Sequence, residues 1–478
     1  MTSRIDGRSV SYRVVCGDIR NRIPRGTLLY GFISTSTVMH GPVRIANLVV
    51  GSGPTADRCT PLGALTIAAA VRETGAEVLF DDYQFIDTDD RWQPEAIARF
   101  LSAEEVAVLG ISAYEHVLPH LVLACDLMKS NGFQGALVLG GPGPSSVAQE
   151  LVSRFPSIDA VVVGDGEEPI QRLLTTPRSE WSQVAGVFTA AGGTTRKCEP
   201  KERETVSPAY DLVSGLDYDR FYLSTSRGCP YSCPYCTVPS QWGGRFAERP
   251  SQKVLSEVRY LTECLNVRRI HIADDGFTAL PRRAVETARA MQEICADVEW
   301  SSYVNLSRVD EELLHELADL GCFSVFAGFE SGSEALLKRL GRPQALRTMA
   351  RTVAALRDRL WIDCSLMWGY PDESVEDFYE TLMTGVWLSE LGESVWVRLF
   401  QLAPLAAAAL TKDGAGQLRF VQGETSGLIQ TTPEQLSDPI VRLIAAHPDV
   451  FSAYCRFDTP QGQRKRELLR EMDIFGPC

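Results

Sequence analysis

The sequence predicts an α/β protein with a doubly wound parallel sheet in its first half and a partial barrel of six βα units in its second. A small, mainly helical C-terminal region is expected to follow. Two observations predict this order. Continuous apolar runs alternate with amphipathic stretches from about residue 44 onward, and glycines directly follow several of these runs. Buried parallel strands are typically continuous apolar runs, and the helices that connect them cover both faces of the sheet.

Size and composition limit the function classes. The chain has 478 residues, a hydrophobic content of 45% and a net charge of −14. It is long enough for two or three domains, and the acidic balance argues against a nucleic-acid partner. We find no apolar run of a signal peptide and none of the ~20 residues needed to cross a bilayer, so we expect no membrane partner and a cytoplasmic protein. Its 13 cysteines are then expected to be reduced thiols.

The first half contains five runs that we predict as strands of the parallel sheet: 43–53, 76–83, 106–114, 135–143 and 159–167. Helical patterns lie between most of them, for example at 62–75 and 116–132. Ligands of such sheets bind beyond the carboxyl ends of the strands, where glycine lets a ligand approach the backbone. The glycines at these ends are Gly51, Gly53, Gly140, Gly141, Gly164 and Gly166. The segment "GSGPTAD" lacks the G-x-G-x-x-G spacing of a dinucleotide site.

Three segments of this half together carry a family resemblance: "CTPLGALTIAAAVRETGAEVLFDD", "LGGPGPSS" and "VVVGDGEEPI". They resemble the Rossmann-like cobalamin-binding domain of cobalamin-dependent radical S-adenosylmethionine (SAM) enzymes. Ser112, followed by Gly140 and Gly141, also resembles part of the wider cobalamin-binding pattern. The resemblance implies a cobalamin site formed by Thr60, Pro61, Leu62, Ser112, Gly140, Gly141, Ser145, Gly164, Gly166 and Glu167.

One part of that pattern is altered. In other cobalamin proteins a histidine from this region binds cobalt, but "DRCTPLG" (57–63) has Cys59 at the corresponding position. The resemblance therefore implies histidine-off cobalamin with a displaced dimethylbenzimidazole tail. Whether Arg58, Cys59, a water molecule or nothing faces the metal stays open in the sequence.

The second half begins after a polar stretch, 192–215, which we predict to be a linker. Its predicted strands are 222–226, 268–273, 298–306, 323–329, 361–369 and 394–402, with helical patterns between them. Six βα units are too few for a closed eight-stranded barrel but suit a partial one. Catalytic groups of α/β barrels lie at the carboxyl ends of the strands. We thus expect an N-terminal extension at 1–43, a first domain at 44–191, a barrel at 216–404 and a C-terminal region at 405–478.

Three cysteines directly follow the first barrel strand: Cys229, Cys233 and Cys236 in "SRGCPYSCPYC". A structural zinc site normally has four ligands, and the usual second ligand pair is absent here. Iron–sulfur cubes ordinarily take one thiolate per iron, so three thiolates leave one iron open. This spacing, with Tyr235 before the last cysteine, resembles the signature of the radical SAM superfamily. The resemblance implies a 4Fe-4S cluster whose open iron chelates SAM and yields a 5′-deoxyadenosyl radical.

Further matches to that superfamily lie at successive strand ends, in "IHIADDGF", "WSSYVNLSRVD", "FAGFESGSE" and "MWGYPDES". The resemblance implies SAM-binding roles for Tyr235, Asp274, Asp275, Asn305, Arg308, Glu330 and Ser331. The residue types agree, because carboxylates accept hydrogen bonds from an ammonium group and from ribose hydroxyls, and arginine pairs with a carboxylate. An aspartate after a strand is also commonly a helix cap, so each match alone is weak.

By resemblance, the expected function is methylation of an unreactive carbon of a small molecule, such as a secondary-metabolite intermediate. One SAM would methylate cob(I)alamin, and a second would supply the radical that abstracts hydrogen. The substrate radical would then take the methyl group, so we assign no protein acid or base. The expected partners are the small-molecule substrate and a reductant such as flavodoxin or ferredoxin.

Three alternatives stay open. The same architecture catalyses ring contraction, cyclisation and other reactions without methyl transfer. Methylthiolation would require a second cluster, for which Cys16, Cys59 and Cys125 are the available amino-terminal thiols. A cobalamin sensor without turnover is the third alternative, although a sensor has little need of a cluster with an open iron. The C-terminal region is expected to cap the barrel mouth or to act as a substrate lid, and Cys478 is expected to lie at a frayed end.

Overall fold

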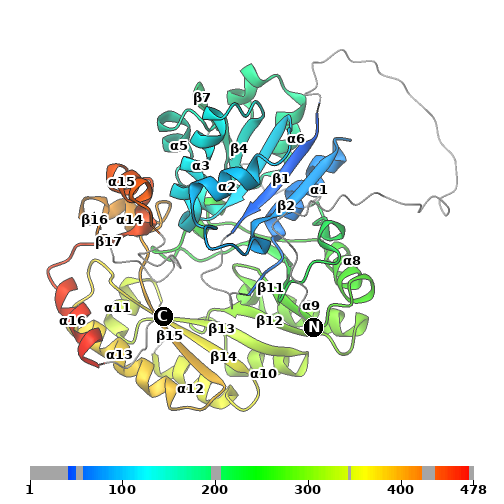
Figure 1. The fold of residues 1–478 in the computed structure, drawn as a ribbon. Helices are drawn as coiled ribbons and strands as arrows, with labels where there is room; N and C mark the ends of the chain where they lie inside the picture. The colour runs from blue at the N-terminus through cyan, green and yellow to red at the C-terminus, as the bar shows by residue number, and fades with distance from the viewer. Residues whose placement is uncertain (1–40, 50–56, 195–205, 343–345, 423–435, 473–478) are drawn as a thin grey trace.

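The computed structural model describes residues 41–49, 57–194, 206–342, 346–422 and 436–472. Figure 1 shows two lobes, one above the other, and both are α/β as predicted. Gly51, Gly53, Cys16 and Cys478 lie outside the described residues. None of the helices within the described ranges combines the length and hydropathy that a bilayer crossing requires.

The first lobe is built on a seven-stranded sheet with the strand order β2-β1-β3-β4-β5-β6-β7. Its first five strands are parallel to one another, and each begins and ends inside a predicted run. The order 2-1-3-4-5 has its switch point between β1 and β3, where doubly wound sheets bind ligands. The strands are β1 Val43–Leu48, β2 Val78–Asp82, β3 Val108–Ala113, β4 Ala136–Gly140 and β5 Ala160–Val162.

Helices cover both faces of this sheet, which explains why β1 is buried at every position. α1 (Leu62–Glu73) and α6 (Glu167–Thr175) pack on one face through small and aliphatic side chains. The other face is covered by α2 (Pro94–Leu101), α3 (Leu118–Ser130) and α5 (Ala148–Arg154). The short helix α4 (Pro142–Ser146) follows β4 at the carboxyl edge.

Two short antiparallel strands, β6 (Val187–Thr189) and β7 (Gly192–Gly193), extend the sheet beyond the five predicted strands. β7 lies in the stretch predicted as a linker. Later in that stretch, Tyr210 and Val213 are buried in the hydrophobic core of the second lobe. The chain therefore packs against the barrel from residue 210 on, before the first barrel strand begins.

The second lobe contains a six-stranded parallel sheet in the order β15-β14-β13-β12-β11-β8, the partial barrel that the sequence predicts. Its strands are β8 Phe221–Leu223, β11 Arg269–Ile272, β12 Glu299–Val304, β13 Cys322–Glu330, β14 Trp361–Trp368 and β15 Val395–Gln401. The outer helices are α8 Ser251–Arg259, α9 Pro281–Ile294, α10 Glu311–Asp319, α11 Glu334–Arg339, α12 Leu346–Leu356 and α13 Val375–Ser389. Alternate strand residues pack against this layer, so the others point to the inner, concave face.

A small hairpin carries the cysteines. β9 (Ser226–Gly228) pairs antiparallel with β10 (Phe246–Glu248), and the connection between them contains Cys229–Cys236 and α7 (Val238–Trp242). Gly228 closes β9 with a φ of +75°, and a Cβ there would lie 2.2 Å from the carbonyl oxygen of Arg245. Only glycine fits this approach, which fixes where the cysteine loop leaves the strand.

The C-terminal region contacts both lobes. It comprises α14 (Ala409–Asp413), α15 (Asp438–Ala446), α16 (Gly462–Met472) and a two-stranded sheet of β16 (Leu418–Phe420) with β17 (Cys455–Phe457). α15 joins the hydrophobic core of the first lobe next to α3, whereas α16 lies against α13 (Figure 1). The region therefore does more than cap the barrel mouth, because it also ties the second lobe to the first.

Candidate active site between the two lobes

A cavity of about 280 Å³ lies between the lobes, at the carboxyl ends of the parallel strands. Its first wall comes from α1, from β1, β3 and β4, and from the loop between β5 and α6. Its second wall comes from the loop after β8, from β9 and from the residues after β11. Because the cysteine loop follows β9 directly, the cavity lies beside that loop.

Six of the residues predicted to bind cobalamin line the first wall: Leu62, Ser112, Gly140, Gly164, Gly166 and Glu167. A Cβ built on Gly140 or Gly164 would meet no atom within 4 Å, so the missing side chains leave open space at both positions. The remaining lining is largely aliphatic, with Ile45, Ile67 and Val138 among it. A deep, apolar slot between a sheet and its helix suits the apolar tail of a large cofactor.

The other predicted cobalamin residues have structural contacts. Thr60 is buried, and its Oγ1 accepts a 2.7 Å hydrogen bond from the backbone N–H of Tyr222 in β8. Ser145 Oγ donates to the carbonyl oxygen of Val162. Gly141 has a φ of +89°, and a Cβ there would lie 2.7 Å from the Ala113 carbonyl oxygen. Pro61 precedes α1 and is not among the cavity residues.

The loop with Cys59 joins the two lobes. Cys59 forms a parallel bridge with Arg220 next to β8, so the first lobe extends the barrel sheet by one residue. Gln84 fixes the loop, because its side-chain amide accepts from Cys59 N–H and donates to the Cys59 carbonyl. Burial raises the pKa of the Cys59 thiol, which keeps it protonated. The Arg58 guanidinium lies 5.0 Å from the Phe85 ring centre.

The three candidate cluster ligands lie together on the hairpin connection, each partly exposed. Burial is the largest cause that raises the pKa of Cys229, and it raises that of Cys236 to about 12. Cys233 contributes to both shifts, so its thiol lies close to the other two. No three His, Cys, Asp or Glu side chains in the described ranges converge on a single metal position. A cube does not require this convergence, because each thiolate binds a different iron.

The two aspartates after β11 have different environments. Asp274 has a fully buried side chain, which accepts hydrogen bonds from Thr225 and Ser226 and so fixes the chain just before the cysteine loop. Asp275 instead lines the cavity. Desolvation, with a smaller contribution from Asp274, raises the pKa of Asp275 to about 6. Of the two, Asp275 is the carboxylate available to a ligand.

Arg342 connects three of the predicted SAM residues. Its guanidinium donates to Tyr235 Oη at 3.0 Å, to Asn305 Oδ1 at 3.2 Å and to Glu330 Oε1 at 2.8 Å. Glu330 is buried and has a φ of +68°, a conformation that costs about 1–2 kcal/mol for a residue with a side chain. Such strain persists where the surroundings hold it, typically at binding sites.

The last two predicted SAM residues differ in position. The Arg308 guanidinium lies 5.1 Å from the ring centre of Tyr231 in the cysteine loop, so it is close to the proposed cluster. Ser331 is fully buried, and its hydroxyl bonds to Thr381 Oγ1 at 2.9 Å. Ser331 therefore links the end of β13 to α13 and has no open side toward a ligand.

Two arginines that the sequence analysis did not select complete the site. Arg342 follows α11 in "LGRP", and Arg227 lies in β9, two residues before Cys229. Arg227 pairs with Asp165 at 3.0 Å and with Glu167, so it joins the first lobe to the strand that leads into the cysteine loop. The position of Arg227 in the quoted cysteine segment is the only signal that could have selected it.

Comparison with known proteins assigns each lobe. Residues 50–174 match the B12 binding domain, and residues 223–384 match the radical SAM superfamily. The chain is 26% identical over 344 residues to the uncharacterized methyltransferase PH0819 of Pyrococcus horikoshii, covering 67% of this chain and 72% of that protein. It is 25% identical to cytidylyl-2-hydroxyethylphosphonate methyltransferase of Streptomyces wedmorensis, covering 59% of this chain and 64% of that protein.

A third relative is the anaerobic magnesium-protoporphyrin IX monomethyl ester cyclase of Synechocystis, 21% identical over 64% of each chain. Among solved structures, the radical SAM methyltransferase TsrM from Kitasatospora setae, with cobalamin and a [4Fe-4S] cluster bound, matches with a TM-score of 0.65. That match covers 91% of each chain at 18% identity, so it supports the fold.

Proposed function

We propose that this chain, a cobalamin-dependent radical SAM methyltransferase whose cofactors are a 4Fe-4S cluster, SAM and cobalamin, methylates an unactivated carbon of a small molecule. The observation that supports this proposal most is that both lobes line one cavity. Candidate cobalamin residues line one side of it, and Asp275 and the strand that enters the cysteine loop line the other. Two cofactors that act on one substrate need this proximity.

When bound, the cluster and SAM supply a carbon radical that abstracts hydrogen, and cobalamin supplies the methyl group. The chain's own residues bind and orient these groups. Cys229, Cys233 and Cys236 would hold three irons. Glu330, oriented by Arg342, and Asp275 would accept hydrogen bonds from the SAM ammonium and ribose groups. Leu62, Gly140 and Gly164 would leave room for the cobalamin tail.

The C-terminal region would keep solvent from the cluster. Leu410 N–H donates a 2.8 Å hydrogen bond to the carbonyl of Pro234, which lies between two of the cysteines. Leu410 and Tyr235 also pack in one small hydrophobic cluster with Tyr370. Exclusion of water and oxygen protects a radical from side reactions.

A labelling experiment tests the proposal. The reconstituted enzyme is incubated without oxygen with SAM that carries a CD₃ methyl group, a reductant such as flavodoxin or ferredoxin, and extracts of candidate secondary-metabolite intermediates. We expect 5′-deoxyadenosine together with a product that carries the deuterated methyl group on carbon. Formation of 5′-deoxyadenosine with an unlabelled product would exclude methyl transfer.

Cyclisation is the second candidate, because two of the relatives are named cyclases. It predicts a ring-closed product without label in the same experiment. Methylthiolation is not favoured by the structure, because Cys125 is completely buried in α3 among aliphatic side chains and cannot reach a second cluster with Cys59. An iron content of about four per chain, not eight, would agree with this.

A further inference from the structure

The inner face of the six-stranded sheet carries a row of aromatic side chains that none of the assignments above uses. Ring centres lie 5.0 Å apart for Tyr222 and His271, 4.7 Å apart for His271 and Tyr303, and 5.7 Å apart for Tyr303 and Phe326. These residues come from four neighbouring strands, β8, β11, β12 and β13. On the last two strands, Trp361 and Trp396 form a separate aromatic pair, with ring centres 5.9 Å apart, near the amino ends of β14 and β15.

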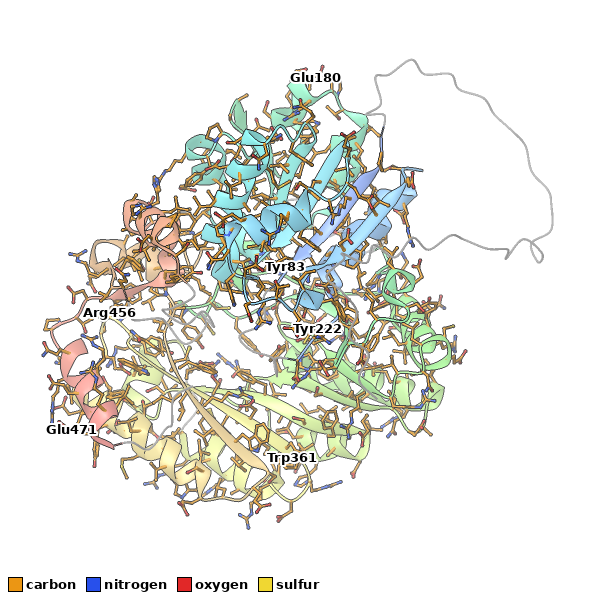
Figure 2. All side chains as sticks on the ribbon, in the orientation of Figure 1. Tyr83, Glu180, Tyr222, Trp361, Arg456 and Glu471 are labelled. Atoms are coloured by element: carbon orange, nitrogen blue, oxygen red, sulfur yellow. The ribbon has the colours of Figure 1, made fainter. Side chains whose placement is uncertain are left out.

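This face is accessible but recessed. Tyr303 is 43% exposed, Trp361 50% and Trp396 56%, and Tyr114 of the first lobe is 45% exposed. Desolvation nevertheless raises the pKa of Tyr303 and raises that of Tyr114 to about 12. A side chain that is both accessible and desolvated lines a concavity. Figure 2 shows Tyr222 at the border of the lobes and Trp361 on the far side of the second lobe.

Two polar side chains on this face have hydrogen-bonding atoms that make no hydrogen bond to a described residue. His271 is 6% exposed; its Nδ1 contacts Ser301 Oγ at 2.9 Å, and its Nε2 has no partner in the described residues. A buried polar atom without a partner is uncommon and calls for a ligand or water. Desolvation, aided by Arg220, lowers the pKa of His271 to about 4, so the ring is neutral at pH 7.

Arg398 provides the second group. Its Nε donates to both oxygens of Asp363, at 2.9 and 2.7 Å, and its terminal nitrogens make no hydrogen bond to any described residue. The Arg398 side chain is 48% exposed. An arginine with two terminal nitrogens available on an accessible face suits a carboxylate or phosphate. Desolvation raises the pKa of Asp363, and Arg398 and Arg220 oppose that shift. Arg220, which pairs with Asp57, therefore lies close to Asp363, and this part of the recess carries two guanidinium groups.

We propose that this inner face is the substrate site and that the substrate is a planar aromatic molecule with a hydrogen-bonding polar group and an acidic group. The rings of Tyr303 and Trp396 would contact the planar body, His271 Nε2 the polar group, and Arg398 the acidic group. This rests on the proposed function, because a molecule on this face lies beside the strand ends that carry Asp275 and the cysteine loop.

Binding of defined probes tests the inference without the natural substrate. Saturation-transfer NMR titrations use the reconstituted holoenzyme with 3-(4-hydroxyphenyl)propionate, with 4-ethylphenol, which lacks the acid, and with butanoate, which lacks the ring. We expect the first probe to bind about tenfold more tightly than either of the others, since a hydrogen bond to a charged group contributes roughly 1.5–3 kcal/mol. Failure of the first probe to bind at millimolar concentration, or equal binding of butanoate, would overturn the inference.

Single substitutions test which side chain binds each part of the probe. Arg398→Met is expected to abolish the preference for the acid, whereas Asp363→Asn is expected to retain it. His271→Phe is expected to weaken both phenols severalfold and to leave butanoate unchanged. Arg282→Met on α9 and His315→Phe on α10 are the matched controls, since both residues lie on outer helices.

Cobalamin uptake, followed by its visible spectrum, reports whether each variant has folded. Should Arg398→Met fail to fold, Trp396→Leu replaces it, because this half-exposed ring can be shortened without opening the core. It is expected to weaken only the ring-containing probes, and unchanged binding would contradict the aromatic contact. Probe binding does not depend on the reaction outcome. If the probes bind as expected but the labelling experiment gives an unlabelled product, the result would contradict methyl transfer and leave the substrate site unaffected.

Discussion

The two walls of the central cavity present different kinds of surface. The first-lobe wall is formed by glycines and aliphatic side chains, and its two acidic residues, Asp165 and Glu167, are already paired with Arg227. The second-lobe wall contains the charged residues Arg227, Arg249 and Asp275, and the buried Glu330–Arg342 pair belongs to the same site outside the cavity lining. The first wall is therefore suited to binding by shape, and the second by charge. Substitutions should therefore distinguish the two walls. A larger side chain should weaken binding at the first wall, and removal of a charged group should weaken binding at the second.

Loss of a cluster ligand should have the largest effect on the charged side. Cys233→Ala is expected to lower the iron content and to reduce SAM cleavage on the order of a thousandfold, because a cube needs its thiolates. Iron analysis and 5′-deoxyadenosine assays measure both quantities. Cys264→Ala is the control, since that thiol is exposed outside the site. Normal turnover of the Cys233 variant would contradict the cluster assignment.

Breaking the Arg342–Glu330 pair should have the next largest effect. Arg342→Met leaves a buried carboxylate without a counter-ion and is expected to lower the free energy of unfolding by about 3–5 kcal/mol, measured in urea. Adding Glu330→Gln should restore most of that stability, because no buried charge then remains. SAM affinity should stay low in the double variant. If it recovered, neither residue would contribute to the SAM site.

A larger side chain in the first-lobe wall should lower the affinity for cobalamin and leave the iron content unchanged. Gly140→Val puts a branched side chain into space that is open in the structure, so we expect the protein to fold and its cobalamin affinity to fall roughly hundredfold, as overpacking of a site predicts. Gly416→Val, also in open space but outside the cavity, is the control. Cobalamin titration and iron content are measured together. Reduced iron in Gly140→Val would show that the two walls are not independent.

The smallest effect concerns pH. Because the pKa of Asp275 is about 6, it is largely neutral at pH 5 and charged at pH 7.5. A charged carboxylate accepts hydrogen bonds from SAM, so SAM should bind severalfold more weakly at pH 5. In the apoprotein this raised pKa favours the folded state at low pH, and the benefit declines as pH rises from about 4 to 6. Asp275→Asn should remove both dependences, as binding and unfolding titrations would show.

Patterns local to the chain were enough to predict most of the fold. Apolar runs and their spacing predicted the parallel strands of both sheets. In the first sheet, β1 is buried at every position because helices cover both faces. In the barrel, alternate strand residues pack against the outer helices. Long-range packing could not be predicted in this way. α15 contributes Ile440 and Ile444 to the core of the first lobe, although it lies more than 200 residues further along the chain. Nothing in its own amphipathic pattern specifies which lobe it joins.

The glycines and cysteines of the candidate site could be selected from the sequence, because their roles depend on backbone space and on thiol chemistry. Residues whose role depends on the direction of the side chain were harder to predict. Asp274 and Asp275 are adjacent in the sequence, yet one is bonded inside the lobe and the other lines the cavity. Thr60 and Ser331 follow the same pattern as Asp274, since both are buried in internal hydrogen bonds. Arg342 escaped prediction because an isolated arginine has no periodic or spacing signal, and Arg227 had only its position next to the cysteine segment.

Metal and cofactor content measures the central claim most directly. Protein reconstituted without oxygen in the presence of iron, sulfide and hydroxocobalamin should hold about four irons, as expected for one cube, and one cobalt per chain. Gly140→Val should keep the iron and lose the cobalt, and Cys233→Ala should show the reverse. A wild-type chain that takes up iron but no cobalamin would contradict the assignment of the cavity between the lobes.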